Sequence, residues 1–253
     1  MKSNTANPLM VKLVTFVIVI GAWEIAGRFI NPLFLSSPSA IFQAFVELVW
    51  SGELVSALLS SITAFLIGMA LAIVVGIAIG VAMGRIRIVE LILEPYVTAL
   101  YSTPSIALIP LFILWFGIDM QPKIAVIFLG ALFPIIINTM AGVRNTEAAL
   151  LRVARSFGAS DALIFRRVVL PGSVPFILTG FRLGIGHALT GVVVAEYIAA
   201  RHGVGQLIAI ASQTFQTPKA LAGVILIAVT GMLLTTILQR IENRFQSWRP
   251  QIR

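Results

Sequence analysis

The sequence predicts an all-α, polytopic membrane protein with six transmembrane helices. Hydrophobic residues make up 58% of the chain, charged residues make up 11%, and the mean hydropathy is +1.00. Soluble domains are much less apolar than this. The apolar residues form long blocks instead of amphipathic stripes, and Lys and Arg concentrate in alternate intervals between the blocks.

Six blocks come close to the roughly 20 apolar residues that a helix needs to cross about 30 Å of hydrocarbon. Continuous apolar runs of this kind must be helical, because a helix satisfies its own backbone in lipid. The first block is followed by Asn31-Pro32 and not by a small-residue cleavage site, so we expect a retained span. The expected spans are approximately residues 10–30, 61–83, 95–116, 124–143, 174–199 and 220–238.

The distribution of basic residues predicts the orientation. With the N-terminus inside, 14 of the 18 Lys and Arg residues fall in cytoplasmic segments, and only Arg28, Lys123, Arg201 and Lys219 fall outside. This asymmetry places both termini and the 144–173 loop in the cytoplasm. It also explains the net charge of +8. Nucleic-acid binding is therefore not needed as an explanation, and it would require a basic face. The chain has no cysteine, which excludes disulfides and thiolate metal sites.

Small residues recur at every fourth position in two of the spans. In the second span they are Gly68, Ala72, Gly76, Gly80 and Gly84, and in the fifth they are Gly180, Gly184 and Ala188. Such stripes let helix backbones approach closely, so we expect helix packing, with a direct role in conduction as the alternative. Pro104 and Pro110 predict a kinked or interrupted third span, which either lines a transport pathway or is a purely structural kink.

The 144–173 loop has helical chemistry of its own. One apolar face is formed at helical spacing by Leu150, Val153, Ala154 and Phe157. Gly158 is expected to end this helix. Ser160 is expected to cap a second short helix with Asp161 in its first turn, and Pro171 to end the unit before the next span.

Two short helices at a glycine corner could serve as a docking surface. Leu163, Ile164 and Phe165 would supply its apolar groups. The alternative is a loop that packs against its own spans.

The loop resembles the EAA loop of ABC importer permeases, whose pattern is Glu-Ala-Ala, three residues, Gly, nine residues and Ile-x-Leu-Pro. In the segment RVARSFGASDALIFRRVVLP, Gly158 matches the glycine, Val168 stands for the isoleucine, and Leu170-Pro171 complete the pattern. Glu147-Ala148-Ala149 lies five residues too early, so the triplet in register is Arg152-Val153-Ala154. The chain therefore departs from the pattern at the glutamate and the first alanine.

The resemblance extends from about residue 60 to the C-terminus. The segments PSIALIPLFILWFGI (104–118), LPGSVPFILTGFRLGIG (170–186) and AEYIAARHGVGQLI (195–208) resemble the nitrate, sulfonate and taurine branch of these permeases. The resemblance implies a type I importer fold, a multi-pass location in the bacterial cytoplasmic membrane, and transport of a small solute of that kind by alternating access.

The resemblance also implies partners: a second copy of the permease, two ABC ATPase subunits and an extracytoplasmic substrate-binding protein. This chain shows no Gly-x4-Gly-Lys-Ser/Thr loop, so we expect no enzymatic activity and no cofactor on it, with ATP and Mg²⁺ bound by the partner ATPase. The residues implied to contact the ATPase are Arg152, Ala154, Gly158, Ala159, Ser160, Asp161, Phe165, Leu170 and Pro171.

Polar residues inside spans are candidates for function because charge is costly in lipid. Glu24 is expected to pair with Arg28 one turn later, and Arg182 to reach the headgroups. Glu196 is interpreted as a gate or a structural anchor near the outer mouth. His187 could donate a hydrogen bond to a small anion in the pathway or bond to another helix. Neither histidine has neighbouring residues in the sequence that suggest a metal site.

A secondary transporter is the alternative function, but it needs charged groups at the midplane and usually an internal repeat. A membrane-embedded enzyme is a third class. The sequence shows no HExxH, no clustered carboxylates and no Gly-x-Ser-x-Gly element.

Overall fold

The computed structural model describes residues 8–31 and 33–245, and every regular element within these ranges is a helix. Lys2, Pro32, Arg249 and Arg253, and with them the orientation expected for both chain ends, lie outside the described residues. Five described helices are long and apolar enough to cross a membrane, and a bent pair of helices is so when taken together. The all-α, polytopic fold is therefore confirmed, with five candidate spans and a sixth if the bent pair crosses the membrane as one span.

Two short helical turns of other types lie between the α-helices. The 3-10 turn Ser105–Leu108 lies at the break between α4 and α5, and the π-helical turn Phe165–Val169 joins α8 to α9 without a break. The helices are α1 Pro8–Phe29, α2 Pro38–Trp50, α3 Glu53–Arg85, α4 Arg87–Ser102, α5 Ile109–Phe116, α6 Met120–Arg144, α7 Ala148–Ser156, α8 Asp161–Ile164, α9 Leu170–Ala199, α10 Val204–Gln213 and α11 Thr217–Phe245.

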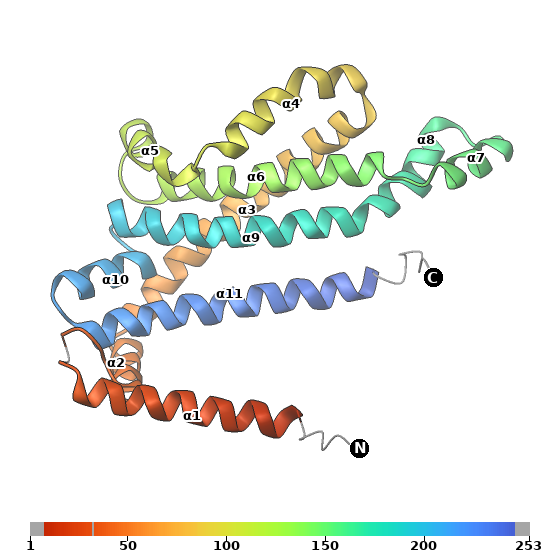
Figure 1. The fold of residues 1–253 in the computed structure, drawn as a ribbon. Coiled ribbons are helices and arrows are strands. Elements are labelled where there is room, and N and C mark those ends of the chain that lie inside the picture. The colour runs from red at the N-terminus through yellow and green to blue at the C-terminus, as the bar shows by residue number, and fades with distance from the viewer. Residues whose placement is uncertain (1–7, 32, 246–253) are drawn as a thin grey trace, which may run out of the picture.

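The long helices run back and forth between two ends of the bundle (Figure 1). The short helices α7 and α8 project from one end, which we call the α7 end. The connections from α1 to α2 and from α9 to α10 lie at the other, which we call the α10 end.

Helix α6 forms the centre of the bundle, between α3 and α9. The small residues of both stripes lie against it. A Cβ on Gly76 would lie 2.8 Å from Ile135 Cγ2, and one on Gly84 would lie 2.7 Å from Val143 Cβ. Gly80 faces Thr139, Gly180 faces the backbone of Pro134, and Gly184 faces Ala131. These contacts allow α3 and α9 to approach α6 at backbone distance.

The third span is interrupted at Pro104, and its two halves meet at 85°. Thr103 adopts an extended conformation (φ −83°, ψ 123°), the conformation that a following proline favours, so α4 ends there. Pro110 causes no break, because it lies in the first turn of α5, where no N–H donor is required.

The loop after α6 contains two short helices, but Pro171 does not end the second one. Asp161–Ile198 is a single continuous helical segment of 38 residues that includes α8, the π-helical turn and α9. The Leu170 N–H donates to the Phe165 carbonyl five residues earlier, directly before the proline. Pro171 lies in the first turn of α9, where a residue without an N–H donor is tolerated, so the helix continues through it.

Two amphipathic helices at the α10 end were not predicted. Helix α2 begins at a Ser37 cap and packs against α3 and α11, and α10 packs against α9 and α11. Both are shorter than a span, with 13 and 10 residues. The Trp23 indole of α1 donates to the Ser36 carbonyl at 3.1 Å, which holds the turn between α1 and α2.

Candidate functional site

The α7–α8 corner is the most exposed part of the described 144–173 loop. Gly158 has a φ of +72°, a left-handed conformation that glycine adopts without strain. The Ser160 hydroxyl accepts a hydrogen bond from the Leu163 N–H at 3.4 Å and caps α8. Phe157 at the tip is 87% exposed. The local chemistry expected of Gly158 and Ser160 is thus present in the structure.

The other residues expected to contact an ATPase follow the same corner into span α9. Arg152 and Ala154 lie in α7, and Ala159 and Asp161 lie in the turn and at the start of α8. Leu170 and Pro171 begin α9. Ile164, expected to be an exposed docking group, is instead buried at 5% exposure because it faces the bundle.

Phe165 is held by a cation from another helix. The Arg85 guanidinium at the end of α3 lies over the Phe165 ring, 4.8 Å from its centroid. This contact joins the corner to α3, and sequence spacing gave no sign of it. Beside it, Glu90 is buried and accepts from Arg87 at 2.8 Å and from Arg144, which ties α4 to the end of α6.

Two charged residues within the expected spans, Glu24 and Arg182, form ion pairs. Glu24 pairs with Arg28 at 2.7 Å, as expected, and also accepts from the hydroxyl of Ser39 in α2. Arg182, with 40% of its side chain exposed, pairs with the buried Glu242 of α11, and its reach to the headgroups stays a prediction. Sequence reasoning missed this pair because its members lie in separate spans.

The break in the third span opens a cavity of about 310 Å³ that contains both Pro104 and His187. The His187 ring meets the Tyr101 ring edge-on, with 6.3 Å between centroids. Ser102, Thr103 and Ser105 contribute hydroxyl groups to the lining, and the described lining residues include no Asp, Glu, Lys or Arg. The Ser102 and Thr103 hydroxyls donate to the Thr98 and Ala99 carbonyls at 2.9 and 3.0 Å, so the donors left for the cavity come from His187, Tyr101 and Ser105.

Glu196 is buried in a polar cluster at the α10 end, with 1% of the residue exposed. Its carboxylate accepts from the Ser61 hydroxyl at 2.7 and 2.9 Å and from the Gly205 N–H at 2.9 Å. Lys123 Nζ lies 3.5 Å from Glu196 Oε1. These bonds join α3, α6, α9 and the loop before α10, which is the arrangement of an anchor.

Lys123 is the residue that sequence reasoning placed least well. Its position before the fourth span suggested a loop residue, yet only 1% of its side chain is exposed. Its Nζ donates to Ser60 Oγ at 3.0 Å and to the His202 carbonyl, and lies 3.8 Å from Asp119 Oδ1. Apart from Asp119, four residues earlier, its partners belong to distant parts of the chain, so local sequence does not show that it is buried.

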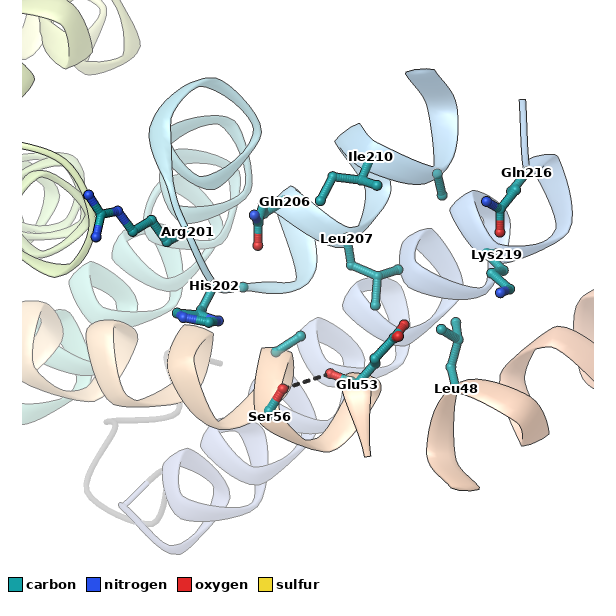
Figure 2. Close-up of a pocket in the computed structure, with 13 residues that line it drawn as sticks. Leu48, Glu53, Ser56, Arg201, His202, Gln206, Leu207, Ile210, Gln216 and Lys219 are labelled. Atoms are coloured by element: carbon teal, nitrogen blue, oxygen red, sulfur yellow. Dashed lines mark hydrogen bonds between the residues drawn. The ribbon is translucent and has the colours of Figure 1, made fainter. Parts of the chain in front are cut away.

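A second cavity, of about 420 Å³, lies next to this cluster at the α10 end. Figure 2 shows Glu53 of α3 and Leu207 of α10 facing one another across it, with Lys219 of α11 to one side. The Arg201 side chain points away from the other labelled side chains. Among the described residues there is no group of three or more His, Cys, Asp or Glu that could hold a metal ion.

The comparisons with known proteins agree with this architecture. Residues 72–247 match the family described as "Binding-protein-dependent transport system inner membrane component". The chain belongs to this family of ABC importer permeases. The match begins within α3 and ends beyond α11, so the loop corner, Lys123 and Glu196 lie in the shared region, whereas Ser61 precedes it.

Curated relatives of the permease cover nearly its whole length. The putative aliphatic sulfonates transport permease SsuC of Bacillus subtilis is 38% identical over 92% of this chain and 85% of its own length. The taurine permease TauC of Escherichia coli is 33% identical over 91% and 86%. The riboflavin permease RibX of Chloroflexus aurantiacus is 38% identical over 92% and 89%.

Solved structures share the fold of the permease. An inward-facing MetNI methionine ABC transporter chain aligns with a TM-score of 0.64 at 20% identity, covering 79% of this chain and 98% of its own. A chain of an amino acid ABC transporter with histidines aligns with a TM-score of 0.62 at 17% identity, covering 80% and 97%. The type I importer permease fold is therefore confirmed.

Proposed function

We propose that this permease moves a small organic or inorganic anion across the cytoplasmic membrane by alternating access driven by a separate ATPase. The complex would contain two copies of the permease, two ATPase subunits and an extracytoplasmic binding protein. The sulfonate and taurine permeases among the relatives support a solute of that class. The riboflavin permease shows that similar identity also accompanies a different named solute.

The observation that carries the proposal is the exposed apolar corner at the α7 end, which continues without a break into span α9. Phe157 is 87% exposed, Val153 54% and Leu163 49%. A projecting apolar surface of this kind is characteristic of a protein interface. Because α8 and α9 form one helical segment, a displacement of the corner by an ATPase would move the span directly.

The topology that suits this mechanism has the α7 end in the cytoplasm and the α10 end outside. The basic residues Arg144, Arg152, Arg155, Arg166 and Arg167 all belong to the α7 end, which agrees with the bias of cytoplasmic segments toward positive charge. The cavity next to α10 would then face the binding protein.

The cavity at the break in the third span is the candidate pathway. Its His187, Tyr101 and Ser105 side chains could bind a sulfonate or nitrate by hydrogen bonds, and the absence of a fixed cation among its described lining would let the anion leave again. Pro104 would serve the pathway by ending α4 and exposing this lining.

Reconstitution tests the proposal. The permease is combined in proteoliposomes with candidate ATPase and binding-protein subunits from the same genome, and uptake of taurine, methanesulfonate and nitrate is measured with and without internal ATP. We expect uptake of one solute only with ATP and its binding protein. Uptake by the permease alone, driven by an ion gradient, would contradict the proposal and favour a secondary transporter.

A charge reversal at the corner tests whether this surface contacts the ATPase. Asp161→Arg places a repulsive charge at the start of α8, where the positive helix end favours an acid. We expect it to reduce co-purification with the ATPase while the permease itself remains folded and monodisperse. Thr214→Arg at the end of α10, far from the corner, should leave co-purification unchanged.

A further inference from the structure

We infer that Lys123 and Glu196 are positioning residues, which hold the 201–206 loop, defined as the end of the α9–α10 connection with the first turn of α10, against α3 and thereby set one wall of the 420 Å³ cavity at the α10 end. The position of the loop is independent of the proposed function. Its consequence for transport rests on that function.

The pair is buried deeply enough for its geometry to matter. Both side chains are 1% exposed, and their charged atoms lie 3.5 Å apart. Two charges withdrawn from water are tolerated only when each is paired and its remaining hydrogen-bonding capacity is used. Asp119 Oδ1, 3.8 Å from Lys123 Nζ and without a hydrogen bond of its own, adds a second negative charge.

Both members of the pair bond to the loop as well as to each other. Lys123 donates to the His202 carbonyl, and Glu196 accepts from the Gly205 N–H. The Val204 N–H between them donates to Ser61 Oγ, which itself donates to Glu196. Three attachments, at His202, Val204 and Gly205, therefore connect this loop to α6, α3 and α9.

The loop sequence is shaped to this cluster. Gly203 has a φ of +143°, and a Cβ there would collide with the Glu196 carboxylate. A Cβ on Gly205 would lie 2.8 Å from Glu196 Cβ. The Gly-Val-Gly stretch is required because the backbone passes directly over the carboxylate, which leaves no room for side chains at its two ends.

The same loop lines the neighbouring cavity. His202, Gly203 and Gln206 contribute to its wall, and Glu53 and Ser56 of α3 form the facing wall (Figure 2). Movement of the loop would change the width of the cavity, whereas the α3 wall belongs to a long helix packed on α6. The buried pair thus fixes the loop wall relative to the α3 wall.

Cysteine labelling tests the position of the loop, because the chain has no cysteine of its own. Gln206→Cys reports on the loop wall and Glu53→Cys on the α3 wall. Each is labelled with a membrane-impermeant maleimide in the intact permease and in the Glu196→Gln background. We expect Gln206→Cys to react about tenfold faster when Glu196 is neutral, the effect of losing one charge-assisted hydrogen bond, and Glu53→Cys to be unchanged.

A second background keeps the test decisive if Glu196→Gln fails to fold. Lys123→Met with Glu196→Gln removes both charges of the buried pair and the bond to His202, and the acid that then loses its cation, Asp119, is 37% exposed. It should fold and show the same selective gain at Gln206→Cys. An unchanged labelling rate at this site in a folded double variant would overturn the inference, and so would an equal rise at both sites, which would indicate general loosening.

Transport then separates positioning from a purely structural role. In the reconstituted complex we expect the double variant to raise the concentration of loaded binding protein needed for half-maximal uptake about tenfold and to keep most of the maximal rate. Loss of maximal rate alone would contradict the assignment. If neither the wild type nor any variant transports a solute, the proposed function is wrong, but the labelling result still tests the position of the loop.

Discussion

The guanidinium group of Arg85 lies over the aromatic ring of Phe165, at 4.8 Å from its centroid. Arg85 is the last residue of α3, and Phe165 begins the π-helical turn between α8 and α9. The contact therefore connects two spans at the position where the α7–α8 corner enters the bundle.

Replacing either partner should weaken the transmission of movement from the corner. A cation–π contact at a partly exposed site contributes about 0.5–1 kcal/mol. We expect Arg85→Ala and Phe165→Ala each to lower the uptake per ATP hydrolysed about two- to fivefold, and the double variant to be no worse than the stronger single one. Reconstituted uptake and phosphate release measured together provide the ratio, and additive losses would show that the two residues act separately.

Gly158 should tolerate only residues that accept a left-handed backbone. Its φ of +72° costs an ordinary residue about 1–2 kcal/mol. We expect Gly158→Val to reduce ATPase co-purification strongly and Gly158→Asn to reduce it less, since asparagine adopts this conformation more readily. Gly172→Ala is the matched control, because a Cβ there meets nothing within 4 Å. Equal effects of all three variants would refute a conformational requirement at the corner.

The contact between α3 and α6 should be sensitive to a single methyl group. A Cβ on Gly80 would lie 2.6 Å from Thr139 Cβ and 2.7 Å from the Ile136 carbonyl oxygen. We expect Gly80→Ala to reduce stability by about 1–3 kcal/mol, the usual cost of overpacking. Thermal denaturation in detergent, followed by loss of the monodisperse peak, measures it. Gly21→Ala on α1, with nothing within 4 Å, should leave the transition unchanged.

His187 should affect solute transport without affecting assembly. It faces the cavity at the helix break and meets the ring of Tyr101. We expect His187→Leu, which removes the donor, to lower uptake of the preferred anion at least tenfold, and His187→Gln, which keeps an N–H, to lower it less. ATPase co-purification should stay at the wild-type level. Wild-type uptake by His187→Leu would remove the residue from the pathway.

Sequence patterns were sufficient for features that depend on local chemistry. Long apolar blocks predicted the spans, Pro104 predicted the interruption of the third, and Gly158 and Ser160 predicted the corner. Each of these depends on backbone constraints that one or a few neighbouring residues impose.

Features that depend on tertiary contacts could not be predicted in this way. Lys123 is an ordinary loop lysine by sequence, and only the approach of Ser60, Glu196 and the His202 carbonyl shows why it is buried. The partner of Arg182 was missed because Glu242 lies in another span. Pro171 was misassigned because a π-helical turn, which has no simple sequence signature, precedes it.

The continuous helical segment Asp161–Ile198 has a mechanical consequence. Its 38 residues extend about 57 Å at 1.5 Å per residue, nearly twice the thickness of the hydrocarbon layer. A rod of that length, pivoting about its tip, turns a tilt of about 5° into a displacement of about 5 Å at its far end. That far end carries Glu196, so a small rotation imposed on one side of the membrane would displace the Glu196 cluster on the other side by several ångströms.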